Sequence, residues 1–160
     1  MSIPLFKHLQ AALHDLDGSY YRLVLVGPAG SGKTPALLAL AQQHGWPRLN
    51  VNLRLAECLL ELTPKQRSVQ AADRLAAIVA DTAAEVVLLD SLELLFAVEL
   101  LLDPLQLLQR LSRNRTIIAA WPGHFTGETL SYAEPGHPEA RRYVRPDARA
   151  ITVVRPGIRA

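Results

Sequence analysis

One stretch of the sequence combines residue types that bind phosphate groups. Residues 27–34 follow the pattern G-x-x-x-x-G-K-[ST], known as Walker A, directly after an apolar run over residues 23–26. An apolar strand, a glycine-rich loop and then a helix form the context in which this pattern binds a nucleotide. The residues predicted to line the nucleotide phosphates are Gly27, Pro28, Ala29, Gly30, Ser31, Gly32, Lys33, Thr34 and Pro35.

Each part of this loop has a separate predicted role. The glycines let backbone N–H groups turn toward an anion, and the positive end of the helix dipole points at the same place. Lys33 is expected to contact the β- and γ-phosphates, and the Thr34 hydroxyl is expected to bind Mg²⁺. The alternative is a glycine-rich turn without a ligand. The base-reading motifs of GTPases do not occur, so we expect ATP as the nucleotide.

A second apolar run ends in a carboxylate. Residues 86–90 read Val-Val-Leu-Leu-Asp, the Walker B pattern. A buried strand of this kind would deliver Asp90 to the carboxyl edge of a parallel sheet, where it could hold Mg²⁺ beside Thr34. The alternative is that Asp90 or Ser91 only starts the next helix.

The chain departs from a typical ATP-hydrolysing site at two positions. Many ATPases of the ASCE class carry a Glu directly after the Walker B Asp, but Ser91 stands there in this chain. Glu93 is the nearest substitute for the base that polarises water, although it could be an ordinary surface residue. Pro35 has no N–H to offer to a phosphate, which predicts modest nucleotide affinity.

Arginines are the candidates for stabilising charge in the transition state, each with a plain surface role as the alternative. We expect an arginine of a neighbouring subunit to act in trans. His124 is a weak candidate for the polar sensor residue after the fourth strand. Only six residues follow the last expected strand, so we expect no C-terminal lid over the nucleotide. The candidate arginines are Arg113, Arg115, Arg141 and Arg142.

Composition indicates one soluble domain over residues 1–160. The chain is 49% hydrophobic with a net charge of +2, and it contains a single cysteine, Cys58, expected in the core. Residues 1–120 hold eleven basic and eleven acidic residues, so the positive excess lies in residues 121–160. Without a secretory leader or an uninterrupted apolar span, a cytoplasmic protein with no membrane segment is expected.

Strands and helices are expected to alternate along the chain. This alternation predicts an α/β fold with a P-loop NTPase (ASCE/AAA-like) core and a five-stranded parallel sheet in the order 5-1-4-3-2. Thr63, Pro64 and Gln66 form a strong helix start. The expected strands are 20–26, 48–52, 85–90, 116–121 and 150–154. The expected helices are 4–15, 34–43, 53–62, 63–82, 91–101 and 103–112.

The connection over residues 122–149 is long and expected to be mostly irregular, with a short hairpin strand at 129–133. Connections of this length are more often functional than inert. Cations and rings are mixed within residues 124–149, which suits contacts to DNA phosphates and bases. A solvated loop is the alternative. The residues that carry this signal are His124, Tyr132, His137, Arg141, Arg142, Tyr143, Arg145 and Arg149.

Two other functions remain open. A small-molecule kinase would share the Walker A loop, and residues 139–149 carry four arginines that could imitate a kinase lid. A module that binds ATP without turning it over would use nucleotide only to control assembly. Phosphate release with water alone separates an ATPase from both.

Over most of its length the chain resembles the BrxF family of small P-loop proteins from type 3 BREX phage-defence systems. The matching segments are VGPAGSGKT, LNVNLRLAECLLELTPKQR, LLDSLELLF, DPLQLLQRLSRNRTIIAAWPG and LSYAEPGHPEARRY. The first and third are common to P-loop ATPases, whereas a nucleotide site does not require the others. The resemblance implies a prokaryotic cytoplasmic protein, an oligomeric ATPase-like module and partners among the other BREX components.

Overall fold

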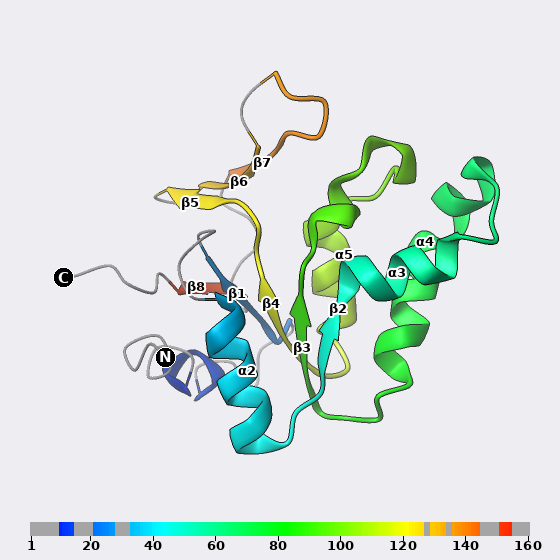
Figure 1. Ribbon diagram of the computed structural model, residues 1–160. Helices are drawn as coiled ribbons and strands as arrows, with labels where there is room; N and C mark the ends of the chain where they lie inside the picture. The colour runs from blue at the N-terminus through cyan, green and yellow to red at the C-terminus, as the bar shows by residue number, and fades with distance from the viewer. Residues whose placement is uncertain are drawn as a thin grey trace.

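The computed structural model describes residues 10–14, 21–27, 33–126, 129–133, 136–144 and 151–154. Its centre is a parallel sheet flanked by helices (Figure 1). Four strands in the order β2-β3-β4-β1 are described with their side chains, and this confirms the predicted order of these strands. They are β1 (Leu23–Val26), β2 (Arg48–Asn50), β3 (Val86–Asp90) and β4 (Thr116–Ala120).

The backbone of β8 (Ile151–Val154) continues this sheet beyond β1. It pairs with β1 in parallel, from Leu23 beside Ile151 to Val26 beside Val154. The hydrogen-bonded order is therefore β2-β3-β4-β1-β8. A sheet of five strands was predicted, and the structure describes backbone and side chains for four of them and the backbone alone for β8.

The inner strands are apolar on both faces because helices cover both sides. All of β1 is buried, and β3 and β4 are buried from their second residue on. Such continuous apolar runs are typical of parallel strands between two helical layers. Residues 10–14 and α2 (Lys33–His44) cover one face, where Leu37 and Leu40 pack on β1 and β4.

The other face is covered by three helices, α3 (Val51–Leu59), α4 (Pro64–Ala80) and α5 (Pro104–Leu111). Their starts follow the expected capping chemistry. The Thr63 hydroxyl accepts from the Gln66 N–H at 3.2 Å, and the Gln66 side chain accepts from the Thr63 N–H at 2.9 Å. This reciprocal pair is the predicted capping box, so the start of α4 is confirmed.

Three local expectations are wrong. Residues 91–101 form two 3-10 turns, η1 (Glu93–Phe96) and η2 (Val98–Leu100), because Ala97 takes an extended conformation between them. The strand expected to reach residue 52 ends at Asn50, since the Asn50 side chain accepts from the Leu53 N–H and starts α3. Cys58 is only half-buried at the margin of the core.

The connection after β4 is a second sheet rather than an irregular loop. β5 (His124–Thr126), β6 (Thr129–Tyr132) and β7 (Arg141–Val144) pair in antiparallel order. β6 coincides with the expected hairpin strand. The sequence carried no strong signal for the other two strands, β5 and β7, because they are only three and four residues long and largely polar. Figure 1 shows this small sheet beyond the carboxyl end of β4.

Among the described residues, no helix has both the length and the apolar character needed to span a bilayer.

Candidate functional site

The carboxyl edge of the parallel sheet brings together the two motifs. β1 ends at Val26, Gly27 follows it, and α2 begins at Lys33. Pro35 lies exposed in the first turn of α2, where the missing N–H of proline is tolerated. The part that lies outside the described structure comprises Pro28, Ala29, Gly30, Ser31, Gly32 and the side chains of Lys33 and Thr34.

The start of the loop is held by the end of β4. The Trp121 N–H donates to the Val26 carbonyl at 2.9 Å, and a Cβ built at Gly27 would lie 3.6 Å from the Trp121 carbonyl oxygen. The turn over residues 121–123 therefore packs directly beside the point where the glycine-rich loop leaves the sheet.

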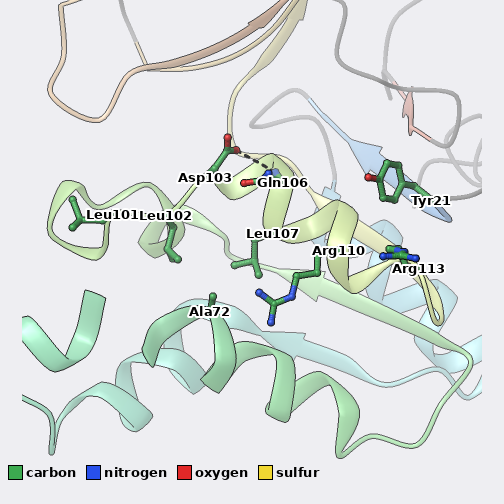
Figure 2. A pocket seen from close by; sticks show the side chains of 9 residues that line it. All are labelled: Tyr21, Ala72, Leu101, Leu102, Asp103, Gln106, Leu107, Arg110 and Arg113. Carbon is green, nitrogen blue, oxygen red and sulfur yellow. Dashed lines mark hydrogen bonds between the residues drawn. The ribbon is translucent and has the colours of Figure 1, made fainter. Parts of the chain in front are cut away.

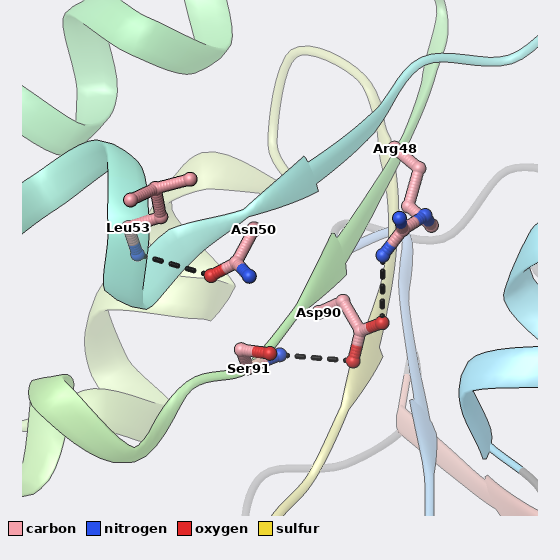
Figure 3. Close-up of polar contacts among 5 residues, drawn as sticks. All are labelled: Arg48, Asn50, Leu53, Asp90 and Ser91. Atoms are coloured by element: carbon pink, nitrogen blue, oxygen red, sulfur yellow. Dashed lines mark hydrogen bonds and ion pairs between the residues drawn. The ribbon is translucent and has the colours of Figure 1, made fainter.

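Asp90 is the last residue of β3, and its side chain is nearly buried, with 7% of its surface exposed. Both carboxylate oxygens are engaged, as Figure 3 shows. Oδ2 lies 3.0 Å from Nη1 of Arg48, and Oδ1 accepts from the Ser91 N–H at 2.9 Å. A buried carboxylate needs such partners because burial alone penalises its charge.

The backbone turns sharply directly after Asp90. Ser91 has a φ of +59°, which is the left-handed region that non-glycine residues rarely adopt. Its carbonyl oxygen accepts from the Asn52 N–H at 2.9 Å, which ties the turn to the start of α3. η1 begins after Leu92 without a side-chain cap, so neither Asp90 nor Ser91 caps a helix.

Asn52 also fixes the position of Glu93. Its Nδ2 donates to Oε1 of Glu93 at 3.0 Å, and its Oδ1 accepts from the Leu94 N–H at 2.7 Å. Glu93 is exposed, and its negative charge helps to raise the pKa of Tyr132, after burial and the charge of Glu139. Glu93 is therefore near enough to the small sheet for its charge to act on Tyr132, and the side chain of Asn52 holds it by a hydrogen bond.

The donor set near Asp90 suits one type of cation. Within the described ranges, no three histidine, cysteine or acidic side chains gather closely enough to hold a metal ion. Mg²⁺ commonly binds through one or two carboxylates, with waters and substrate phosphates filling its other positions. Asp90 suits this role by type and position, because it is a carboxylate at the carboxyl edge of the sheet. In addition to Asp90, the Thr34 hydroxyl remains a predicted ligand.

Arg113 and Arg115 lie at the opposite end of the sheet. Arg115 precedes β4, whose first residue pairs with the first residue of β3. Its Nη1 donates to the Val79 carbonyl at 3.1 Å and to the Ala84 carbonyl at 3.2 Å, which closes the α4–β3 connection. A role for either arginine in this site would require a neighbouring subunit, and that role stays a prediction.

Arg113 lines a hollow of about 510 Å³ on the α5 side of the molecule (Figure 2). Tyr21 and Arg110 also line it, and Leu102 and Leu107 contribute apolar surface. Arg110 forms an exposed ion pair with Asp73 at 3.2 Å. Neither Asp90 nor Gly27 is among the residues that line the hollow.

The small sheet turns one face toward the core. Arg141 Nη2 donates to the Leu102 carbonyl at 2.9 Å, and the Tyr143 hydroxyl donates to Oδ1 of Asp103 at 2.7 Å. Burial, together with this hydrogen bond, raises the pKa of Tyr143 well above its ordinary value. Because side chains alternate along a strand, Arg142 points to the other face, and it is exposed.

An aromatic joint seats the small sheet on the parallel sheet. It consists of Phe96, Trp121, Tyr132 and Tyr143. Phe96 stacks on Tyr132 with ring centroids 3.8 Å apart, and Trp121 Nε1 donates to the Ser131 carbonyl at 3.0 Å. Tyr132 and Tyr143, which by sequence are candidates for stacking on bases, thus contact other rings within the protein. His124 and Arg142 pair with Ser131 on neighbouring strands, and both are exposed on the outward face of the small sheet.

Sequence reasoning missed Arg48 and Asn52. Arg48 stands 42 residues before Asp90, and only the pairing of β2 with β3 brings them together. Arg48 and Asn50 lie on the same side of β2, with buried Leu49 between them, and this alternation was the available signal. Asn52 carried no local signal, because its partners follow Asp90 in the chain.

Comparison with protein-family models, with curated proteins and with solved structures finds no match to this chain.

Proposed function

We propose that this chain is an ATP·Mg²⁺-binding module with a P-loop NTPase core of the ASCE, AAA-like type. The observation that carries the proposal is the position of Asp90. It is a nearly buried carboxylate at the carboxyl end of β3, on the sheet edge from which the Walker A segment leaves β1 at Gly27. Ligands of open α/β sheets bind at this edge.

In this proposal each residue has a defined task. The backbone N–H groups of residues 27–32 other than Pro28 would bind the phosphates, Lys33 would neutralise the β- and γ-phosphates, and Thr34 and Asp90 would hold Mg²⁺. Glu93 orients or deprotonates the attacking water. When bound, the metal ion polarises the transferred phosphoryl group.

Hydrolysis by this site is slow or conditional. Ser91 occupies the position next to Asp90 where ASCE enzymes carry their Glu, and Glu93 is tied to Asn52. Among the described arginines, Arg48 is engaged by Asp90, Arg115 by backbone carbonyls, and Arg141 by the Leu102 carbonyl. A neighbouring copy that supplies an arginine would complete the site, so we propose a homo-oligomer whose assembly responds to nucleotide.

The wider role that we propose follows the resemblance to the BrxF family. The module would act in the cytoplasm within a phage-defence system, together with the other BREX proteins or with DNA. DNA contacts would come from the outward face of the small sheet, since the inward face is used for packing.

The central test measures molecular size and phosphate release together. Lys33→Ala should abolish ATP binding, and with it the change of size on adding ATP and the release of phosphate. Lys65→Ala is the matched control, because it removes the same charge from an exposed site on α4. ATP binding that survives in Lys33→Ala would contradict the proposal.

The same assay separates the alternatives. Phosphate release that requires a small-molecule acceptor would identify a kinase. Nucleotide-dependent assembly without any phosphate release would identify a module that binds but does not hydrolyse ATP.

A further inference from the structure

The ion pair between Arg48 and Asp90 occupies the carboxylate that a metal ion would need. Arg48 pairs with Leu88 across the β2–β3 ladder, whereas Asn50 pairs with Asp90. The Arg48 side chain must therefore reach two residues further along β3 to contact Asp90. It reaches Oδ2 at 3.0 Å. Figure 3 shows this contact beside the Ser91 N–H that binds the other oxygen.

The two partners differ in their access to water. The Asp90 side chain is 7% exposed, whereas the Arg48 side chain is 30% exposed. Asp90 therefore depends on a protein partner or a metal ion for compensation of its charge. Arg48 can leave Oδ2 for water at a smaller cost, because part of its side chain is already solvated.

A divalent cation at Asp90 would lie within a few ångströms of the Arg48 guanidinium. Like charges at this separation repel strongly where the surroundings are partly buried. The carboxylate can therefore be compensated fully by Arg48 or by the cation, but both together are unfavourable.

We propose that Arg48 is an internal counter-ion of Asp90 that competes with the divalent cation for this carboxylate. Before the cation binds, Arg48 compensates the charge of Asp90 and keeps the edge of the sheet folded. Binding of the cation displaces Arg48 from Oδ2. The identity of this cation as the Mg²⁺ of bound ATP rests on the proposed function, whereas the competition itself rests on the geometry of β2 and β3.

The test uses Mn²⁺ alone as the probe, with free Mn²⁺ measured by electron paramagnetic resonance. Arg48→Gln should lower the half-saturating Mn²⁺ concentration about tenfold, because it removes one competing charge while keeping a polar side chain. Arg74→Gln is the matched control for net charge, since Arg74 lies exposed on α4 and should bind Mn²⁺ like the parent. Asp90→Asn should lose the site in both backgrounds.

A stability measurement separates competition from a merely structural role. In chelator, Arg48→Gln should melt below the parent because the nearly buried Asp90 loses its ion pair with Arg48. Saturating Mn²⁺ should raise its melting temperature by more than that of the parent, and Asp90→Asn should abolish this gain. Arg48→Lys retains the competing charge, so it should bind Mn²⁺ with nearly the affinity of the parent. A tenfold gain in affinity by Arg48→Lys would contradict the competition even if Arg48→Gln did not fold.

Unchanged or weaker Mn²⁺ binding by Arg48→Gln, or unchanged binding by Asp90→Asn, would overturn the competition. Failure of the proposed function has a different signature. A fluorescent ATP analogue would then bind the parent no better than Lys33→Ala, even though Mn²⁺ affinity still responded to Arg48.

Discussion

Two regions at the carboxyl end of the parallel sheet use side chains in opposite ways. The polar edge consists of Arg48, Asn52, Asp90 and Glu93, and Glu93 is exposed although it is hydrogen-bonded to Asn52. The aromatic joint consists of four rings, and Leu130 of the adjoining small sheet is wholly buried in the core. The first region keeps charged side chains at the edge of the sheet, whereas the polar atoms of the second form hydrogen bonds that hold the two sheets together.

This difference shows why residue types alone are a poor guide to binding. Tyr132, Tyr143 and Arg141 suited a nucleic-acid surface by composition, yet all three contact the rest of the protein. Asp90 lies deeper than any of them, but its surroundings are polar. Substitutions in the joint should change stability, and substitutions at the polar edge should change binding or the rate of hydrolysis.

The strongest test of the joint is Gly123→Ala. A Cβ at this position would lie 1.7 Å from the Ser131 carbonyl oxygen and 2.8 Å from Trp121 Nε1, so the small sheet must move away. We expect a loss of about 3 kcal/mol in the free energy of unfolding, measured by urea denaturation. Gly45→Ala is the control, since its φ of +69° adds strain of about 1 kcal/mol in open space. Equal losses in both variants would contradict the close approach.

Tyr143→Phe tests the polar contact of the joint. The variant loses the hydrogen bond to Asp103, which should cost about 1–2 kcal/mol near neutral pH. Because folding raises the pKa of Tyr143, this residue stabilises the protein fully below its ordinary pKa of 10.0. The stabilisation falls as pH rises above that value, since the unfolded chain then releases the phenolic proton more readily.

Urea denaturation at about pH 8 and about pH 11 measures this effect. The parent should lose more unfolding free energy over this interval than Tyr143→Phe. An identical loss in both proteins would show that burial and the hydrogen bond to Asp103 do not keep the hydroxyl of Tyr143 protonated.

The sequence predicted the parts of the fold that are encoded locally. Continuous apolar runs placed β1, β3 and β4 between helical layers, and Thr63 with Gln66 marked the start of α4. Asp90 followed from its place at the end of such a run. In each case the signal lies within a few residues.

The missed features depend on contacts that are distant in sequence. Arg48 and Asp90 are 42 residues apart, and Tyr143 and Asp103 are 40 apart. Within the small sheet only β6 was expected, because the strands are short and because Leu130 is buried in a core cluster of which most other members are distant in sequence. Ser91 shows the same limit, since its positive φ is imposed by Asn52 and the sheet edge.

Asn52→Asp tests the polar edge without removing an acceptor. The new carboxylate still accepts from the Leu94 N–H, but it places a second negative charge beside Glu93. The loss of the Nδ2 donor and the added negative charge should release the Glu93 side chain from residue 52, which the chemical shift of its carboxyl carbon in carbon-13 NMR can detect. If Glu93 is the base, the rate of ATP hydrolysis should fall while ATP binding stays unchanged.

Asn114→Asp provides the matched control, because it adds the same charge at an exposed position before β4, near the other end of the sheet. It should leave Glu93 unchanged. A released Glu93 side chain with an unchanged rate of ATP hydrolysis would show that Glu93 takes no part in the reaction.

The smallest expected effect comes from neighbouring arginines of β7. Arg141→Ala loses its bond to the Leu102 carbonyl and should destabilise the fold by about 1 kcal/mol, whereas Arg142→Ala should change stability by less than about 0.5 kcal/mol. In DNA binding we expect the reverse order, with a larger effect for Arg142→Ala than for Arg141→Ala. Both side chains are exposed, but Arg142 lies on the outward face of the small sheet, so its loss should reduce the salt dependence of binding to a duplex by about one ion, measured by fluorescence anisotropy. If both variants bound DNA like the parent, the outward face of the small sheet would have no role in DNA binding, and the two faces would differ only in packing.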